Sequence, residues 1–146
     1  MVDVNLFKKI NEWLKLYEPI GDWLYFNSTP VELGATSMNT LPSSSVKEHI
    51  DGSKDVTLLF TIRLIKNYDE GTSDINMEAL DEVVEFTNWI TEMDKNKNYP
   101  DLGENLIVNE VDVITNVPSL AVDSTALLAQ YSFNAKLIYR DESEVI

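Results

Sequence analysis

The sequence predicts an α+β fold, in which a mainly antiparallel β-sheet has two α-helices packed on one face. Strand patterns occur in groups separated by only two helical patterns, and the strand–helix–strand alternation of parallel sheets is missing. The 146 residues correspond to a single domain over 1–146, with an acidic C-terminal tail at about 141–146. A hydrophobic content of 44% is sufficient for a packed core.

The first predicted element is an amphipathic helix from about Val4 to Tyr17, with Asp3 as its N-cap. Pro19 and Gly21 are expected to end it. A short aromatic strand follows over 23–26. The apolar residues of the helix recur at helical spacing: Leu6, Phe7, Ile10, Trp13, Leu14 and Tyr17.

A hairpin is predicted around Asp51-Gly52, a dipeptide typical of tight turns. Its first strand covers Val46 to Ile50. Its second strand is long and two-faced, with one apolar face made of Val56, Leu58, Phe60, Ile62 and Leu64. The preceding residues are expected to be irregular with at most a brief strand, and we interpret 28–54 as a candidate self-association arm hinged by Pro30 and Pro42.

A second helix is predicted from a cap at Asn76 to about Met93. Its expected buried stripe contains Met77, Leu80, Val84 and Met93 beside Val83, Phe86, Trp89 and Ile90. Trp13, Trp23 and Trp89 are all expected in the core.

A third strand is predicted over Leu106–Val117, where Pro118 ends it. Ser119 to Thr125 are expected to lead into a final long strand over Ala126–Arg140. That strand has one apolar face: Leu127, Ala129, Tyr131, Phe133, Ala135, Leu137 and Tyr139. Long strands leave sheet edges that must be covered, so we expect the edge or far face of this strand to be completed by a neighbouring copy.

The charge of −14 and the pI near 4.2 oppose tight binding to nucleic acid, which normally needs a Lys/Arg surface. The chain has no cysteine, which excludes disulfides and thiolate chemistry. No apolar run reaches the roughly 18 residues that span a membrane, and the N-terminal segment lacks the pattern of a signal peptide. We expect no membrane association.

Two groups of residues are candidates for a catalytic or metal-binding site. His49, beside Glu48 and Asp51, is the only histidine and is interpreted as an exposed hairpin residue. The segment from Asp94 to Asn98 resembles the start of a calcium loop, but Tyr99 stands where glycine must turn. We therefore predict no catalytic, cofactor-binding or metal-binding residues, and no enzymatic activity.

The second helix has the most unusual charge pattern, because nine acids and no Lys or Arg lie between Asp69 and Asp94. Glu78 with Glu82, and Asp81 with Glu85, are like-charge pairs at helical spacing. A solvated outer face is the favoured interpretation. The alternatives are a surface for a basic neighbour or the wall of a channel that repels phosphate.

Four segments together resemble the tail terminator and minor capsid proteins of long-tailed bacteriophages, the group similar to the lambda-type tail terminator. They are WLYFNSTPVE (23–32), HIDGSKDVTLLFTIRL (49–64), FTNWITEMDKNKNYPDLG (86–103) and STALLAQYSFNAKLIYRDE (124–142). The features shared with the family fall on Asp51-Gly52, on Phe86 and Trp89 before Pro100, and on Tyr139. The resemblance covers nearly the whole chain.

The resemblance implies a structural virion protein and no chemistry. Such a protein forms a ring, commonly a homo-hexamer, that caps the tail tube and joins it to the head connector, while DNA passes through the lumen without specific binding. Its expected partners are copies of itself, the tail tube protein and the head–tail connector protein. Its expected location is the tail or neck of the virion, after assembly in the cytoplasm of the bacterial host.

Two other functions remain open from the residues. One is a small ligand-binding domain or enzyme with a pocket lined by Trp23, Phe60, Trp89 and Tyr131. The other is an adaptor that uses the acidic helix to dock a basic partner.

Overall fold

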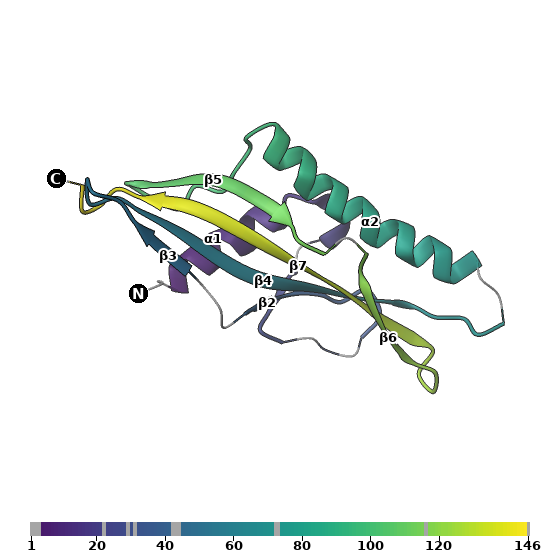
Figure 1. Cartoon of the computed structure of the whole chain (residues 1–146). Helices are drawn as coiled ribbons and strands as arrows, with labels where there is room; N and C mark the ends of the chain where they lie inside the picture. Colours follow the sequence, from purple (N-terminus) through teal and green to yellow (C-terminus); the bar gives the residue numbers. More distant parts are fainter. Residues whose placement is uncertain are drawn as a thin grey trace.

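A computed structural model of the chain describes residues 4–21, 23–28, 30, 32–41, 45–71, 74–115 and 117–145. The chain forms one curved seven-stranded sheet with two α-helices, as the α+β prediction requires (Figure 1). The helices are α1 (Val4–Leu14) and α2 (Asp74–Lys95), with a 3₁₀ turn, η1 (Glu18–Ile20), between α1 and the sheet. The strands are β1 (Tyr25–Phe26), β2 (Thr36–Thr40), β3 (Ser45–Glu48), β4 (Lys54–Asn67), β5 (Leu106–Val113), β6 (Ser119–Asp123) and β7 (Leu128–Asp141).

The two long strands β4 and β7 form the centre of the sheet, antiparallel over 14 residues each. β2 and β3 pair with successive parts of the other side of β4, and β5 and β6 do the same along β7. β1 pairs with β2 and is the one parallel strand among those described. The predicted hairpin is confirmed, since β3 and β4 are joined by the turn at Asp51-Gly52.

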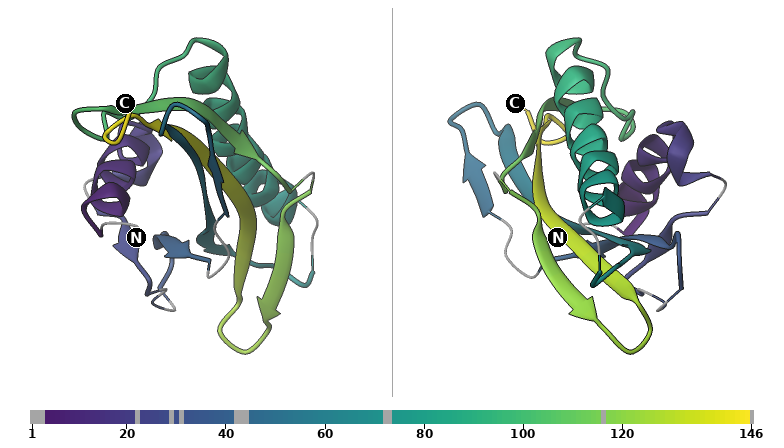
Figure 2. Two further views of the ribbon diagram at one scale, coloured as in Figure 1. Left: turned by 60° about the vertical axis from the view of Figure 1, so that its left-hand side comes forward. Right: turned by 90° about the vertical axis from the view of Figure 1, so that its right-hand side faces the viewer.

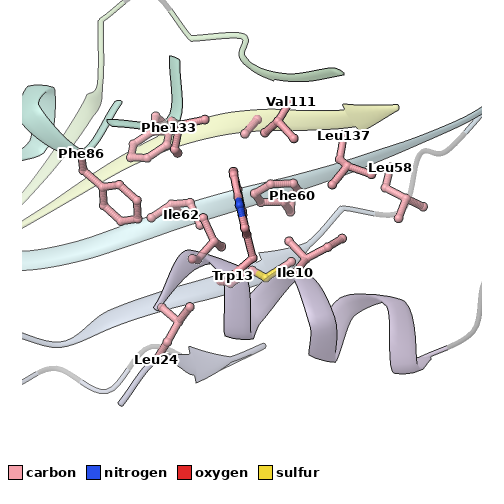
Figure 3. Packing of buried hydrophobic residues seen from close by; sticks show 14 of the residues in the cluster. Ile10, Trp13, Leu24, Leu58, Phe60, Ile62, Phe86, Val111, Phe133 and Leu137 are labelled. Carbon is pink, nitrogen blue, oxygen red and sulfur yellow. The ribbon is translucent and has the colours of Figure 1, made fainter. Parts of the chain in front are cut away.

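The register places the apolar faces of both long strands on the same side of the sheet, with Val56 opposite Tyr139 and Ile62 opposite Phe133. Because side chains alternate between faces in a strand, this register aligns the apolar positions from Val56 to Leu64 of β4 with those from Tyr139 to Tyr131 of β7. Both helices lie on this side and share one core with it (Figures 2 and 3). Phe60 and Phe86 are fully buried there, and Phe86 packs edge-on against Phe133 with ring centroids 5.7 Å apart.

The first helix is shorter than predicted, because α1 ends at Leu14 and not at Tyr17. The Lys15 amide still bonds four residues back, but the amides of Leu16 and Tyr17 bond three residues back, which tightens the chain before η1. Pro19 lacks an amide hydrogen and favours this exit. The predicted cap Asp3 lies outside the described residues. None of the helices in the described part is long and apolar enough to cross a membrane.

The second helix is longer than predicted, and its buried stripe differs. The residues buried are Ala79, Val83, Phe86 and Ile90. Met77 is 67% exposed and Leu80 is also exposed, so their predicted burial is wrong. Asn76 is not the cap either: it lies inside α2, and its side chain bonds both the amide and the carbonyl of Asp69.

The third strand is shorter than predicted, and a further strand follows it. β5 ends at Val113, and Ser119–Asp123, which were predicted to be a connection, form β6. The carboxylate of Asp123 accepts the amides of Thr125 and Ala126 and so forms the turn into β7. The final strand therefore begins at Leu128, after Leu127 has adopted a positive φ of 56°.

Candidate assembly interface

The edges of the long strands are covered within the chain, contrary to the expectation that a neighbour completes the edge of the last strand. β7 has β4 on one side and β5 and β6 on the other, while β4 has β2 and β3 on its second side. In the described part of the chain, the unpaired edges belong to the short strands β1, β3, β5 and β6. Any completion of the sheet by another chain must therefore occur at a short strand.

Two of these four edges carry features that prevent sheet extension. β3 presents Lys47 and Glu48. β5 carries Glu110 and Asp112 and a bulge between Val108 and Glu110. Charges and bulges on an edge strand oppose pairing with another chain.

The β6 edge is exposed along its whole length and carries Leu120 and Val122 between Ser119 and Asp123. Leu120 is 52% and Val122 is 43% exposed, although both stand on the helix-covered side of the sheet, opposite Tyr131 and Ala129. The β6–β7 hairpin projects from the body of the molecule and diverges from α2, which leaves these side chains uncovered (Figure 2). The sequence signal that was overlooked is the alternation in SLAVD before an Asp-Ser-Thr turn.

The β1 edge is also apolar, and it borders a notch against α1. Val4, Lys8, Asn11, Leu24 and Phe26 line this notch, which has a volume of about 230 Å³. Phe26 contacts Phe7 of α1, with ring centroids 6.1 Å apart, and remains partly exposed. The notch is thus an apolar depression directly beside a free strand edge.

Trp23 lies next to this notch and is 67% exposed, so its predicted burial is wrong. It packs only on the edge of Tyr25, at 5.9 Å. By contrast, Trp13 is buried and packs against the half-buried Trp89 at 5.3 Å, as predicted for both. The pocket imagined between Trp23, Phe60, Trp89 and Tyr131 does not form, because Phe60 and Tyr131 are inside the packed core while Trp23 is on the surface.

The outer face of α2 is acidic and exposed, as predicted. Glu78, Asp81 and Glu85 are exposed, and Glu82 forms an ion pair with Lys66 at 2.7 Å. The carboxylates of Glu85 and Glu82 add to the effect of burial in raising the pKa of Tyr17, which packs against Phe86. The negative field of α2 therefore reaches the neighbouring η1 region.

The predicted self-association arm is largely part of the sheet. Thr36–Thr40 and Ser45–Glu48 are strands paired with β4, so the described part of 28–54 is ordered within the subunit. Pro30 is among the described residues, whereas Pro42 lies outside them. This interpretation of 28–54 as an arm is therefore wrong for the described residues.

His49 is half-buried and not freely exposed as predicted, since its Nε2 lies 2.9 Å from Asp55 Oδ2. Asp94 of the candidate calcium loop accepts the Tyr99 hydroxyl at 2.7 Å and the Val111 amide at 3.0 Å. The Asp94 carboxylate therefore accepts hydrogen bonds within the fold. The part of the chain that the structure describes has no group of three or more acidic or histidine side chains placed to hold a metal ion.

Tyr99 and Asp94 together fix the bulge of β5 to the end of α2. The Tyr99 hydroxyl oxygen also lies 3.1 Å from the backbone carbonyl oxygen of Asn109, the extra residue of the bulge. Burial and the Asp94 carboxylate raise the pKa of Tyr99 to about 12. The bulge is therefore a structural feature held by a specific polar network.

The predicted acidic tail is not a free extension. The backbone amide of Glu142 donates to the Asn105 carbonyl, and the Glu144 carboxylate pairs with Lys54 at 2.9 Å. Gly52, in the β3–β4 turn, approaches the Glu144 backbone so closely that a Cβ would collide with it. The tail thus closes one end of the molecule, opposite the β6–β7 hairpin (Figure 1).

No protein-family model matches this chain, and no curated protein matches it.

Proposed function

We propose that this protein is a structural component of a long-tailed bacteriophage: a ring-forming tail terminator or minor capsid protein that caps the tail tube and joins it to the head connector. The observation that supports this best is the pair of edge strands with exposed apolar side chains, β1 and β6, on a sheet whose other free edges, β3 and β5, carry charges. Exposed edge strands with apolar side chains are templates for pairing with other chains. A contact between two different edges of successive copies is heterologous and closes into a ring when the rotation is right.

The acidic face of α2 fits a ring through which DNA passes. Like-charge pairs such as Asp81 with Glu85 destabilise a helix by a few tenths of a kcal/mol, so they weaken the isolated subunit slightly. A wall of carboxylates repels phosphates and lets DNA slide without being held. The same face would serve the adaptor alternative, in which it docks a basic partner.

The ligand-binding alternative has weaker support. The pocket predicted for it between Trp23, Phe60, Trp89 and Tyr131 does not form, because Phe60 and Tyr131 are buried in the packed core and Trp23 is on the surface.

Two measurements test the proposal. Negative-stain electron microscopy of the purified protein, alone and mixed with tail tubes, is expected to show rings and rings seated on tube ends. Tubes polymerised with the protein present should be capped and should stop growing. Unbound tube ends and unrestricted tube growth would refute the proposed function, whatever the oligomeric state in solution. Salt-sensitive binding to a basic protein without any tube binding would instead favour the adaptor.

A further inference from the structure

We propose that β6 of one copy pairs with β1 of the next copy, so that Leu120 and Val122 enter the notch between β1 and α1. This deepens the proposed function, because it assigns the two surfaces of the contact from which a ring is built. The partner is a second copy of this chain.

The first argument is that these two edges are the ones left unprotected. The β3 edge carries charges, and the β5 edge carries charges and a bulge. β1 and β6 present aromatic and aliphatic residues, namely Tyr25 and Phe26 on β1 and Leu120 and Val122 on β6. An apolar edge is the one that a β-augmentation contact uses.

The second argument is that the faces match. Phe26 is aligned with Met38, which is fully buried on the helix-covered side, so Phe26 faces that side as well. Leu120 and Val122 stand on the same side of the sheet, opposite Tyr131 and Ala129. If the sheet continues from β1 of one copy into β6 of the next, these apolar side chains meet at the notch. A shift of the β1–β6 pairing by one residue would turn Leu120 and Val122 to the opposite face of the sheet.

The third argument is charge. The whole chain has a net charge of −14, so a contact between copies needs a local cation. Lys8 lines the notch, is exposed, and has no acidic partner in the described ranges. The β6 end carries Asp123. The positive rim of one surface therefore faces the negative end of the other.

The test uses two variants that each block one surface. In the hairpin variant, Leu120→Glu and Val122→Glu place carboxylates on β6. In the notch variant, Val4→Glu and Lys8→Glu place carboxylates at the notch. All four side chains are exposed, and an acid at Val4 suits the first turn of a helix, so both variants are expected to fold. The matched control is Val46→Glu, which changes an exposed valine on the same side of the sheet but on the β3 edge.

Oligomeric state is measured by size-exclusion chromatography with light scattering, and folding by circular dichroism. Wild type and Val46→Glu are expected to form the same oligomer, and each blocked variant is expected to associate about 100-fold more weakly. A mixture of the two blocked variants should give a 1:1 dimer and nothing larger, because the one intact notch and the one intact hairpin pair just once.

The outcomes separate the two proposals. Rings that persist in both blocked variants would overturn this interface and leave the proposed function intact. A mixture that stays monomeric, or a wild-type chain that never associates, would also overturn the interface, while tube capping continues to decide the function. Loss of tube capping with an intact wild-type oligomer would overturn the function alone.

Discussion

The centre of the sheet and its β6–β7 end share strand β7 but differ in what covers their apolar side. At the centre, Phe133 and Leu137 of β7 are buried under the helices. At the hairpin, Leu120 and Val122 stand on the same side of the sheet and are half exposed, because α2 diverges from them (Figure 2). Alternation along a strand therefore determines which face a side chain takes, whereas the path of the helix determines whether that face is covered.

A similar contrast exists within α2. Its C-terminal half buries Phe86 and Ile90, while Met77 and Leu80 in the first turns are exposed. A helix of 22 residues extends about 33 Å at roughly 1.5 Å per residue, and its buried residues begin only at Ala79. The exposed apolar residues of both elements occur at the same end of the molecule, where we propose that a second copy binds.

The largest expected effect on the free energy of unfolding comes from replacing a leucine by alanine at the centre of the sheet, compared with the same substitution in the β6–β7 hairpin. Leu58→Ala, at 1% exposure in the core, is expected to cost about 2–5 kcal/mol of unfolding free energy, since it removes buried methyl groups and leaves a cavity. Leu120→Ala should change the unfolding free energy by less than about 0.5 kcal/mol. Urea unfolding of dilute, monomeric protein measures both. Equal costs for the two leucines would contradict the contrast drawn between centre and hairpin.

An intermediate effect is expected at Gly52, which ties the C-terminal tail to the end opposite the hairpin. Its φ is +91°, and a Cβ there would meet the Glu144 backbone. Gly52→Ala should therefore cost about 2–3 kcal/mol, part from the left-handed backbone and part from displacing the tail. The measurement is again urea unfolding.

Gly34 provides the matched control, because its φ is +84° but a Cβ would meet nothing within 4 Å. Gly34→Ala is expected to cost about 1 kcal/mol from backbone strain alone. In a chain that ends at Glu142, the difference between the two glycine variants should vanish. A difference that survives this truncation would show that the tail is not what Gly52 accommodates.

A smaller effect, with a defined pH dependence, is expected at the β5 bulge. Tyr99→Phe removes the hydrogen bond to the Asp94 carboxylate and should cost about 1–1.5 kcal/mol near neutral pH. The pKa of Tyr99 is raised to about 12 in the folded chain, above the usual value near 10. The unfolded chain therefore loses this proton first, so the contribution of Tyr99 to stability is complete below about pH 10 and falls as the pH rises toward 12.

Unfolding free energies of wild type and Tyr99→Phe between about pH 8 and 11 measure this dependence. The variant should show a shallower loss of stability above about pH 10. Tyr68→Phe is the control, because the Tyr68 hydroxyl makes no hydrogen bond within the described part of the chain. Parallel pH profiles for wild type and Tyr99→Phe would mean that the hydroxyl is not held as described.

Several features followed from local patterns. The hairpin at Asp51-Gly52 is correct because an Asp-Gly dipeptide between alternating strands specifies a tight turn, and Gly52 does adopt a positive φ. The apolar face of β4 is correct because strict alternation over a long strand leaves one register. The prediction of exposed acids on α2 also holds.

Other features depended on distant partners. β6 was missed because an alternation of only five residues is a weak signal for a strand, and it exists through pairing with β7. The predicted burial of Trp23 was wrong, because apolar neighbours in the sequence do not show whether a helix covers that part of the sheet. The candidate interface was invisible for the same reason, since β1 and β6 are almost 100 residues apart along the chain.

The amino-acid sequence by itself determined the element types, the two-faced long strands and the acidic helix, because periodicity and charge are local properties of the chain. The tertiary structure alone decided which edges are covered, where α2 stops protecting apolar side chains and which strands remain free. The physical reason is that burial is a property of pairs of surfaces: a side chain leaves water when another element reaches it, and the reach of α1 and α2 is set by the packing of the whole core.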